Sequence, residues 1–276
     1  MNYLRLETDS YTFYLTISKG TASHTISIGG RKGECVNISV NTPESLMVQR
    51  GYHSLDTATI PVLAFAADKD LVKGSGTVAM INTALSEAVK RYPYVKMFTF
   101  TDNSHITCDN GNGISLLSLS VVEHRKTWYE RNFNAILVDS ALAKKYQDGL
   151  KILEDPELKL PFPEFKNIIN SYTTSSAALK PHYENSANYF DFFASILKAE
   201  GKAGLCNLIA DWIDIFLLYI FQFNPLTVSW AIPSDSIGEV VTREVKLNRK
   251  PANQIGGRRT RRNGSRVNIN DIIELE

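Results

Sequence analysis

The chain has 276 residues, of which 43% are hydrophobic and 21% are charged. This composition is that of an ordinary globular protein and excludes disorder of the whole chain. Thirty lysines and arginines nearly balance 29 aspartates and glutamates, so the overall charge predicts no strong attraction to nucleic acid or to an anionic membrane.

The first fifty residues predict β-strands. Glycines separate three short runs that are rich in β-forming residues, at residues 12–18, 24–28 and 35–40. The next run, IPVLAFAAD at residues 60–68, is almost continuously apolar, as expected of a strand that is covered on both faces.

The middle of the chain alternates helices with strands. Apolar residues at helical spacing predict helices at residues 78–92 and 114–126, and β-rich runs predict strands at residues 95–101 and 135–139. The polar, glycine-bearing segment 103–113 is expected to be a loop. This order is typical of an α/β protein with short connections.

Helical patterns dominate after Asp139. They fall at residues 141–153, 164–172, 183–199 and 205–223, and a strand is predicted at residues 226–232. We therefore expect an α/β core at residues 1–140, with the strand 226–232 as a candidate member of its sheet. Residues 141–244 would form a helical annex.

One helical pattern, residues 205–223, has the length of a membrane span of roughly 20 residues. However, Asp211 and Asp214 lie near its middle, where a carboxylate is costly in a bilayer. We therefore expect a single amphipathic helix buried against protein rather than a span.

Cysteine and histidine usage predicts neither disulfides nor metal. Cys35, Cys108 and Cys206 are far apart and odd in number, which favours reduced thiols in a cytoplasmic compartment. The five histidines show no ligand spacing, so no metal site is predicted. The first residues lack the charged and apolar regions of a secretory signal.

A glycine-bearing loop joins the apolar strand to the first helix. It comprises Lys73, Gly74, Ser75, Gly76 and Thr77. Glycines let the backbone approach an anion, and a helix N-terminus offers unpaired N–H groups, so this loop is a candidate phosphate cradle. The alternative is a plain turn between strand and helix.

The order of this loop, the helix, the second strand and the segment Trp128–Phe133 resembles the GNAT acyltransferase superfamily. In that family a [Gln/Arg]-x-x-Gly-x-[Gly/Ala] loop holds the pyrophosphate of CoA, and a pattern close to L-Y-x-K-x-G-F precedes a further strand. The resemblance covers about eighty residues and implies a GNAT-like mixed central sheet with flanking helices. The helical annex and an extended basic tail would follow this core.

By this resemblance, acetyl-CoA would be bound by the backbone of residues 73–77, and Tyr129 would protonate the departing thiolate. Asp68, at the end of the strand before the loop, is the nearest candidate for the general base. The family's Gln/Arg position is Leu71 here, and its frequent asparagine is Val122. Two readings stay open: an N-acetyltransferase, or a non-catalytic scaffold in which Tyr129 is part of an aromatic packing cluster.

The C-terminal residues 245–276 predict an extended basic tail. It concentrates Arg258, Arg259, Arg261 and Arg262 between glycines and asparagines. Such clusters bind acidic protein surfaces or nucleic-acid phosphates, although a solvated tail without a partner is the alternative. Together with K-T-W-Y-E-x-x-F-x-A, the tail resembles GNAT-related proteins of nucleocytoplasmic large DNA viruses. The alternative to an enzyme is then a structural, capsid-associated protein of such a virus, which reuses the fold as a non-catalytic scaffold and contacts neighbouring subunits in a virion through the basic tail.

Overall fold

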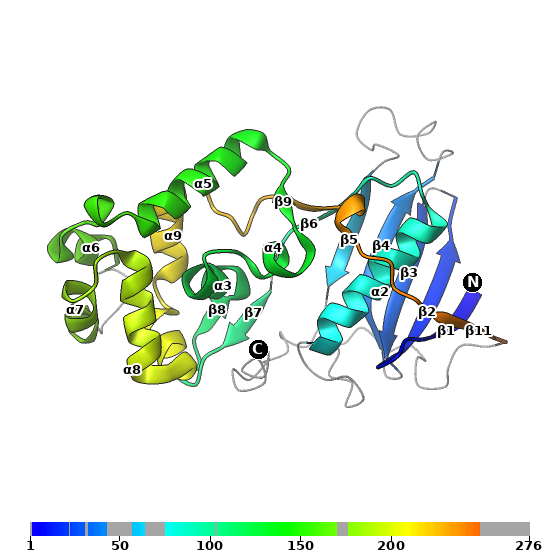
Figure 1. Ribbon diagram of the computed structural model, residues 1–276, viewed down its shortest axis with the longest axis horizontal. Helices are drawn as coiled ribbons and strands as arrows, with labels where there is room; N and C mark the ends of the chain where they lie inside the picture. Colours follow the sequence, from blue (N-terminus) through cyan, green and yellow to red (C-terminus); the bar gives the residue numbers. More distant parts are fainter. Residues whose placement is uncertain are drawn as a thin grey trace.

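The computed structural model describes residues 2–21, 23–30, 33–42, 57–63, 75–102, 104–169 and 176–248. These residues form a nine-stranded mixed sheet and, beside it, a lobe made mainly of helices (Figure 1). The expected α/β class is therefore confirmed. Several predicted site residues lie outside the described residues, namely Asp68, Leu71, Lys73, Gly74 and the tail arginines.

The strand order of the large sheet is β11-β1-β2-β3-β4-β5-β6-β10-β9. The strands are β1 (Asn2–Glu7), β2 (Thr12–Lys19), β3 (Ser23–Gly30), β4 (Gly33–Asn41), β5 (Thr57–Leu63), β6 (Met97–Phe100), β9 (Ile136–Leu137), β10 (Trp230–Pro233) and β11 (Arg243–Leu247). Among these strands, β5 and β6 pair in parallel and the other neighbours pair antiparallel. Of the strand predicted at residues 226–232, only residues 230–232 lie in this sheet, as part of β10.

Helix α2 (Ser75–Arg91) links the parallel pair and covers one face of the sheet (Figure 1). Its inward stripe is apolar at intervals of three and four residues, and it is fully buried: Met80, Ile81, Ala84, Leu85 and Ala88. Residues of the sheet alternate in burial, as Phe13 and Leu15 of β2 show. This packing explains why the helix forms where the sequence periodicity predicts it.

The helical lobe contains α3 (Leu116–His124), α4 (Trp128–Phe133), α5 (Ser140–Glu154), α6 (Phe162–Ile169), α7 (Ser176–Glu184), α8 (Tyr189–Ile209) and α9 (Ile213–Phe221). Two short 3₁₀ helices, η1 (Pro156–Leu158) and η2 (Ser234–Ser236), complete the described helices. Aromatic rings fill the centre of the lobe, with Phe165 in contact with Tyr183, Phe192, Trp212 and Phe216. The lobe begins before residue 140, because α3 packs against α8 and α9.

The segment predicted as a loop at residues 103–113 includes a strand and its turn. Strand β7 (His105–Thr107) pairs with β8 (Gly113–Ser115) in a separate hairpin. At its turn, Asn110 forms hydrogen bonds with Asn207, from backbone N to Oδ1 at 3.0 Å and from Nδ2 to O at 3.1 Å. The hairpin is therefore stabilised by a contact with α8 that lies far away in the sequence.

The expectation of reduced thiols is wrong for two cysteines. Cys108, in the hairpin turn, is bonded to Cys206 of α8, with Cα atoms 5.6 Å apart, while Cys35 is free and buried. Spacing along the chain could not reveal this pair, because 98 residues separate its members and only the tertiary fold brings them within bonding distance.

The expected single helix at residues 205–223 is also wrong. Helix α8 ends at Ile209 and α9 begins at Ile213, with an 80° bend between them. Buried Trp212 sits at the bend and donates its indole N–H to the Leu208 carbonyl. Of the described helices, none alone is long and apolar enough to cross a membrane, although the bent pair α8–α9 passes that test jointly.

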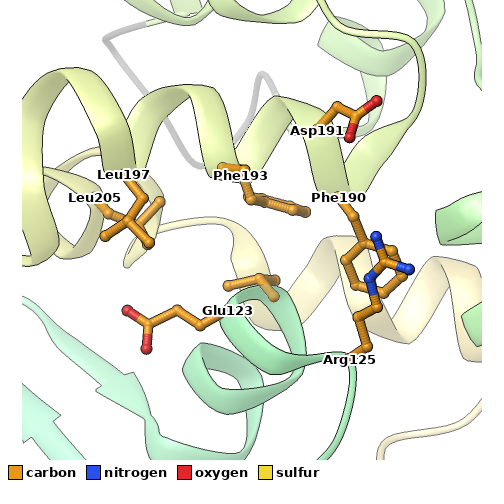
Figure 2. A pocket seen from close by; sticks show the side chains of 9 residues that line it. Glu123, Arg125, Phe190, Asp191, Phe193, Leu197 and Leu205 are labelled. Carbon is orange, nitrogen blue, oxygen red and sulfur yellow. The ribbon is translucent and has the colours of Figure 1, made fainter. Parts of the chain in front are cut away.

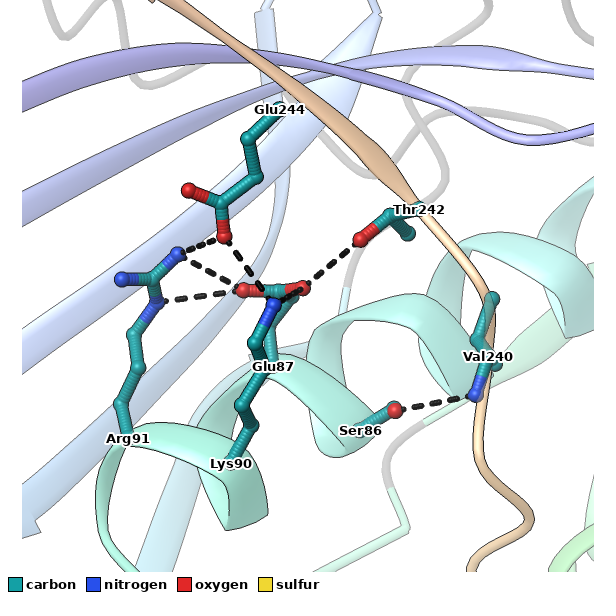
Figure 3. A network of polar contacts seen from close by, with 7 residues as sticks. All are labelled: Ser86, Glu87, Lys90, Arg91, Val240, Thr242 and Glu244. Carbon is teal, nitrogen blue, oxygen red and sulfur yellow. Dashed lines mark hydrogen bonds and ion pairs between the residues drawn. The ribbon is translucent and has the colours of Figure 1, made fainter.

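The C-terminal strand lies inside the fold rather than in a free tail. Strand β11 pairs with β1 from Glu7↔Arg243 to Tyr3↔Leu247, so the boundary expected at residue 245 falls within it. Figure 3 shows how the segment before β11 runs across α2: Val240 N–H donates to Ser86 Oγ, and Thr242 donates to Glu87. Strand β11 is therefore the ninth strand of the sheet, and the composition of its residues did not predict it.

Candidate functional site

The candidate site lies where the parallel strands β5 and β6 end. Their pairing covers only Thr57–Thr59 against Met97–Thr99, although β5 continues to Leu63. Ligands of α/β proteins commonly bind at the carboxyl ends of parallel strands, where the edge of the sheet opens. The residues that follow β6 therefore determine which chemical groups are available at this edge of the sheet.

Asp102 is the second residue after β6, and its side chain is buried, with 1% of the residue exposed. Its Oδ1 accepts hydrogen bonds from the backbone N of Ser104, at 2.9 Å, and from the Ser104 hydroxyl. Its Oδ2 has no partner among the described residues. Burial raises the pKa of the Asp102 carboxyl, and the bonds from Ser104 oppose that rise.

Tyr129 completes the cluster from the first turn of α4. Burial raises the pKa of its hydroxyl well above the ordinary value, the nearby Asp102 charge raises it further, and the nearby Ser104 hydroxyl opposes both. Ser104, whose hydroxyl donates to Asp102, therefore lies beside Tyr129. The Tyr129 ring packs on Phe100 of β6, with centroids 4.5 Å apart, and only 6% of the residue is exposed.

Local hydrogen bonds hold α4, and therefore Tyr129, in place. Thr127 accepts the N–H of Glu130 at 3.1 Å, and the Glu130 carboxylate accepts the N–H of Thr127 at 2.7 Å, which is a capping box. The same carboxylate accepts the Tyr146 hydroxyl at 2.7 Å. The spacing Thr-x-x-Glu is visible in the sequence, and it places Tyr129 within the first helical turn.

The described part of the predicted phosphate loop is the start of α2. Ser75, Gly76 and Thr77 form its first turn, which carries no acidic residue. A helix N-terminus without carboxylates attracts anions, because its first N–H groups lack helical partners. The role of these residues toward a pyrophosphate stays a prediction. Lys73, Gly74 and the candidate base Asp68 fall outside the described residues.

Sequence reasoning missed Asp102 and Ser104. The signal that could have found them is the change from an apolar strand to Thr-Asp-Asn-Ser, since polar residues that directly follow a buried strand often line a site.

For metal, the described residues contain no group of three His, Cys, Asp or Glu side chains able to hold an ion.

Comparisons with known proteins return nothing: no family model, no curated protein and no solved structure matches the chain.

Proposed function

We propose that the chain is an acyl-CoA-dependent N-acyltransferase of the GNAT type, with the reaction at Asp102, Ser104 and Tyr129. The observation that carries the proposal is the buried Asp102 carboxylate, which keeps one oxygen without a partner among the described residues, accepts the Ser104 hydroxyl and lies near the buried Tyr129 phenol. Clusters of perturbed acids in a confined place are typical of proton-transfer sites.

The arrangement of elements around the cluster supports the choice of cosubstrate. Strand β5, helix α2, strand β6 and helix α4 occur in the order that the GNAT resemblance requires, with β7, β8 and α3 between β6 and α4. Strand β5 pairs with β6 only over its first three residues. The first turn of α2 would hold the pyrophosphate, and the opening between the two strands would take the pantetheine. Acetyl-CoA would supply an activated acyl group as a thioester.

Asp102 and Tyr129 each carry out one of the two proton transfers of the reaction. Asp102 Oδ2, which has no partner in the described structure, accepts the proton that the acceptor amine loses as its nitrogen bonds to the acyl carbon. A raised pKa suits Asp102 to this task, because a base is most effective when its pKa approaches the working pH. Tyr129, kept protonated by its raised pKa, donates its proton to the thiolate as the carbon–sulfur bond breaks.

Both groups have to be restored for the next turnover, because after the reaction Asp102 holds one extra proton and Tyr129 lacks one. Asp102 releases its proton from Oδ2 to solvent, and Tyr129 takes up one proton from solvent. The Ser104 hydroxyl donates to the other carboxylate oxygen, Oδ1, and keeps the carboxyl group in place.

The test is single-turnover acyl transfer from acetyl-CoA to a panel of primary amines. We expect Tyr129→Phe and Asp102→Asn to lower the rate about 10²–10⁴-fold without weakening the binding of acetyl-CoA. Tyr183→Phe is a matched control, because Tyr183 is also buried with a raised pKa but lies in the helical lobe. Equal rates in Tyr129→Phe and Tyr183→Phe would remove Tyr129 from the mechanism.

A non-catalytic scaffold, such as a capsid-associated protein of a large DNA virus, is the second candidate. It is favoured by the enclosure of Tyr129 among the rings of Phe100, Trp128 and Phe133. Calorimetric titration separates the two: an absence of acetyl-CoA binding at about 1 mM would reject the enzyme and support the scaffold.

A further inference from the structure

The turn of the β7–β8 hairpin carries two successive Asn-Gly pairs, Asn110–Gly111 and Asn112–Gly113. Asparagine is a chemically labile residue, because the backbone nitrogen of the next residue can attack its side-chain amide. Glycine in that next position has no side chain to obstruct the attack. A third pair, Asn263–Gly264, lies outside the described residues. The two pairs of the turn differ in their hydrogen bonds, and this difference determines which of them is open to attack.

The pair Asn110–Gly111 is protected by three hydrogen bonds. The Gly111 N–H donates to the Cys108 carbonyl at 2.9 Å, which engages the attacking nitrogen. The side chain of Asn110 is held as well, because its Oδ1 accepts the N–H of Asn112 at 3.0 Å and its Nδ2 donates to the Asn207 carbonyl at 3.1 Å. Attack at Asn110 therefore requires these contacts to break.

The Gly113 nitrogen, in contrast, points away from β7. Antiparallel ladders alternate hydrogen-bonded with non-hydrogen-bonded pairs. The Cys108 N–H donates to the Asn112 carbonyl at 2.8 Å, so the next pair in the register, Thr107↔Gly113, is a non-hydrogen-bonded one. No hydrogen bond from the Gly113 nitrogen is found within the described part of the chain, and this nitrogen is therefore free to attack Asn112.

The amide of Asn112 is anchored at one atom. Its Nδ2 donates to the Asp211 carboxylate, while its Oδ1 forms no hydrogen bond with the described residues. Asn112 is half-buried, and both Gly113 and Asp211 are exposed, so water reaches this part of the turn. The contact with Asp211 is therefore the main obstacle to reaction at Asn112.

This contact helps to attach the hairpin to a segment that lies between two breaks in the helical lobe. Helix α8 is broken at Gly201, whose φ of 69° favours glycine, and the chain bends by 80° between α8 and α9. Before the break at Gly201, α8 encloses a small cavity with α3 (Figure 2). After it, the disulfide at Cys206 and the hydrogen bond to Asp211 attach the chain to the hairpin turn.

We propose that Asn112 is a site of spontaneous deamidation, and that the reaction weakens the attachment of the hairpin. The Gly113 nitrogen bonds to Asn112 Cγ, the Cγ–Nδ2 bond breaks, and the proton of the Gly113 nitrogen ends on the departing ammonia. Water then opens the cyclic imide at either carbonyl, which leaves aspartate or isoaspartate at position 112. No oxidant or reductant takes part, and the site does not depend on the proposed acyl transfer.

The product changes the contact with Asp211 in two ways. The amide that donated to Asp211 is lost, and a second carboxylate takes its place beside the first. Like charges at short distance disfavour each other, so a former hydrogen bond becomes a repulsion. The hairpin turn is then attached through the disulfide and the contacts of Asn110 with Asn207.

The first test follows deamidation of the full chain in mildly alkaline buffer at physiological temperature. Tandem mass spectrometry of the tryptic peptide 97–125, which carries both pairs, assigns the product to Asn110 or Asn112. We expect Asn112 to react about tenfold faster or more in the folded chain, since each additional hydrogen bond at Asn110 slows the attack by about 2–10-fold. In concentrated urea this difference should largely disappear.

Gly113→Ala provides the matched control. A Cβ at this position would meet nothing nearer than the Ile106 carbonyl oxygen, at 3.8 Å, so the variant should fold as the wild type does. The added methyl group obstructs the attacking nitrogen, and most of the product at Asn112 should be lost. Three results would overturn the proposed site: equal rates at Asn110 and Asn112 in the folded chain, an equally large difference in urea, or undiminished deamidation in Gly113→Ala.

The second test measures the effect on the hairpin with Asn112→Asp, which supplies the product directly. We expect its melting temperature to fall by about 2–6 °C through the lost hydrogen bond and the new repulsion. Asn112→Asp/Asp211→Asn should regain most of this loss, because the exchanged pair again places an amide donor opposite a carboxylate. An unchanged melting temperature in the single variant, or no recovery in the double variant, would overturn the proposed weakening.

Discussion

At the scale of single residues, Asp102 makes stability depend on pH. Its folded-state pKa is raised by burial, so the folded state retains a proton that the unfolded state releases. Stability should therefore be greatest below the ordinary carboxyl pKa and fall as pH rises through the raised one. In Asp102→Asn this loss should disappear, making the variant more stable than the wild type at pH 7 by about 1–3 kcal/mol.

Urea denaturation of both proteins at several pH values between about 3.5 and 8 checks this sign. The gap in unfolding free energy between the variant and the wild type should widen with pH. A gap that narrows would mean that the Asp102 carboxylate is stabilised by a positive partner, and it would contradict the proposed role of Asp102 as a base.

Arg91 provides a second residue-scale prediction, because Glu87 of α2 is 1% exposed and depends on charge pairing. Arg91 Nη2 lies 2.8 Å from Glu87 and 2.5 Å from Glu244 of β11 (Figure 3). Arg91→Met should leave Glu87 with weaker compensation and cost about 1–3 kcal/mol of unfolding free energy, less than a fully buried pair because Arg91 is partly exposed.

Lys90→Met is the matched control for Arg91. Lys90 approaches the same two carboxylates, at 3.7 Å and 3.4 Å, but its side chain is 60% exposed. An exposed pair contributes little, so this variant should lie within about 0.5 kcal/mol of the wild type in thermal and chemical unfolding. Equal losses in the two variants would assign the effect to net charge instead of geometry.

At the scale of secondary-structure elements, the Cys108–Cys206 bond joins the β7–β8 hairpin to α8 across 98 residues. A cross-link that closes so long a loop restricts the unfolded chain, so reduction should cost about 2–4 kcal/mol. Urea denaturation with and without dithiothreitol measures the loss. The double variant Cys108→Ser/Cys206→Ser should unfold as the reduced wild type does and show no further response to the reductant.

An element could be predicted where the spacing of its own apolar residues shows which face is buried. An element that depends on contacts with distant residues could not be predicted. The apolar stripe of α2 predicts the helix, and the alternation of apolar and polar residues predicts strand β2. The bend at Trp212 interrupts the apolar pattern, and the carboxylates on either side have distant partners: Asp211 accepts a hydrogen bond from Asn112 of the hairpin turn, and Asp214 accepts one from Ser118 of α3. In the site, Tyr129 was found through the motif around it, whereas Asp102 stands in a polar segment whose burial only the tertiary structure reveals.

At the scale of the whole molecule, the C-terminal strand protects an open edge of the large sheet. Strand β11 covers β1, whose residues Leu4 and Leu6 are buried, and an uncovered edge strand promotes association between chains. A chain that ends at Gly238 loses β11, the contact of Thr242 with Glu87 and the contact of Glu244 with Arg91. A chain that ends at Asn248 keeps all three.

Comparison of these two truncations tests that protection. The chain ending at Gly238 should unfold at a lower temperature and form concentration-dependent oligomers, because β1 then exposes unpaired N–H and C=O groups along its length. The chain ending at Asn248 should remain free of such association in sedimentation velocity runs. If both chains associate equally, the edge at β1 is not the contact surface, and the two-residue strand β9 at the opposite edge of the sheet, where Ile136 and Val138 are exposed, becomes the surface to alter next.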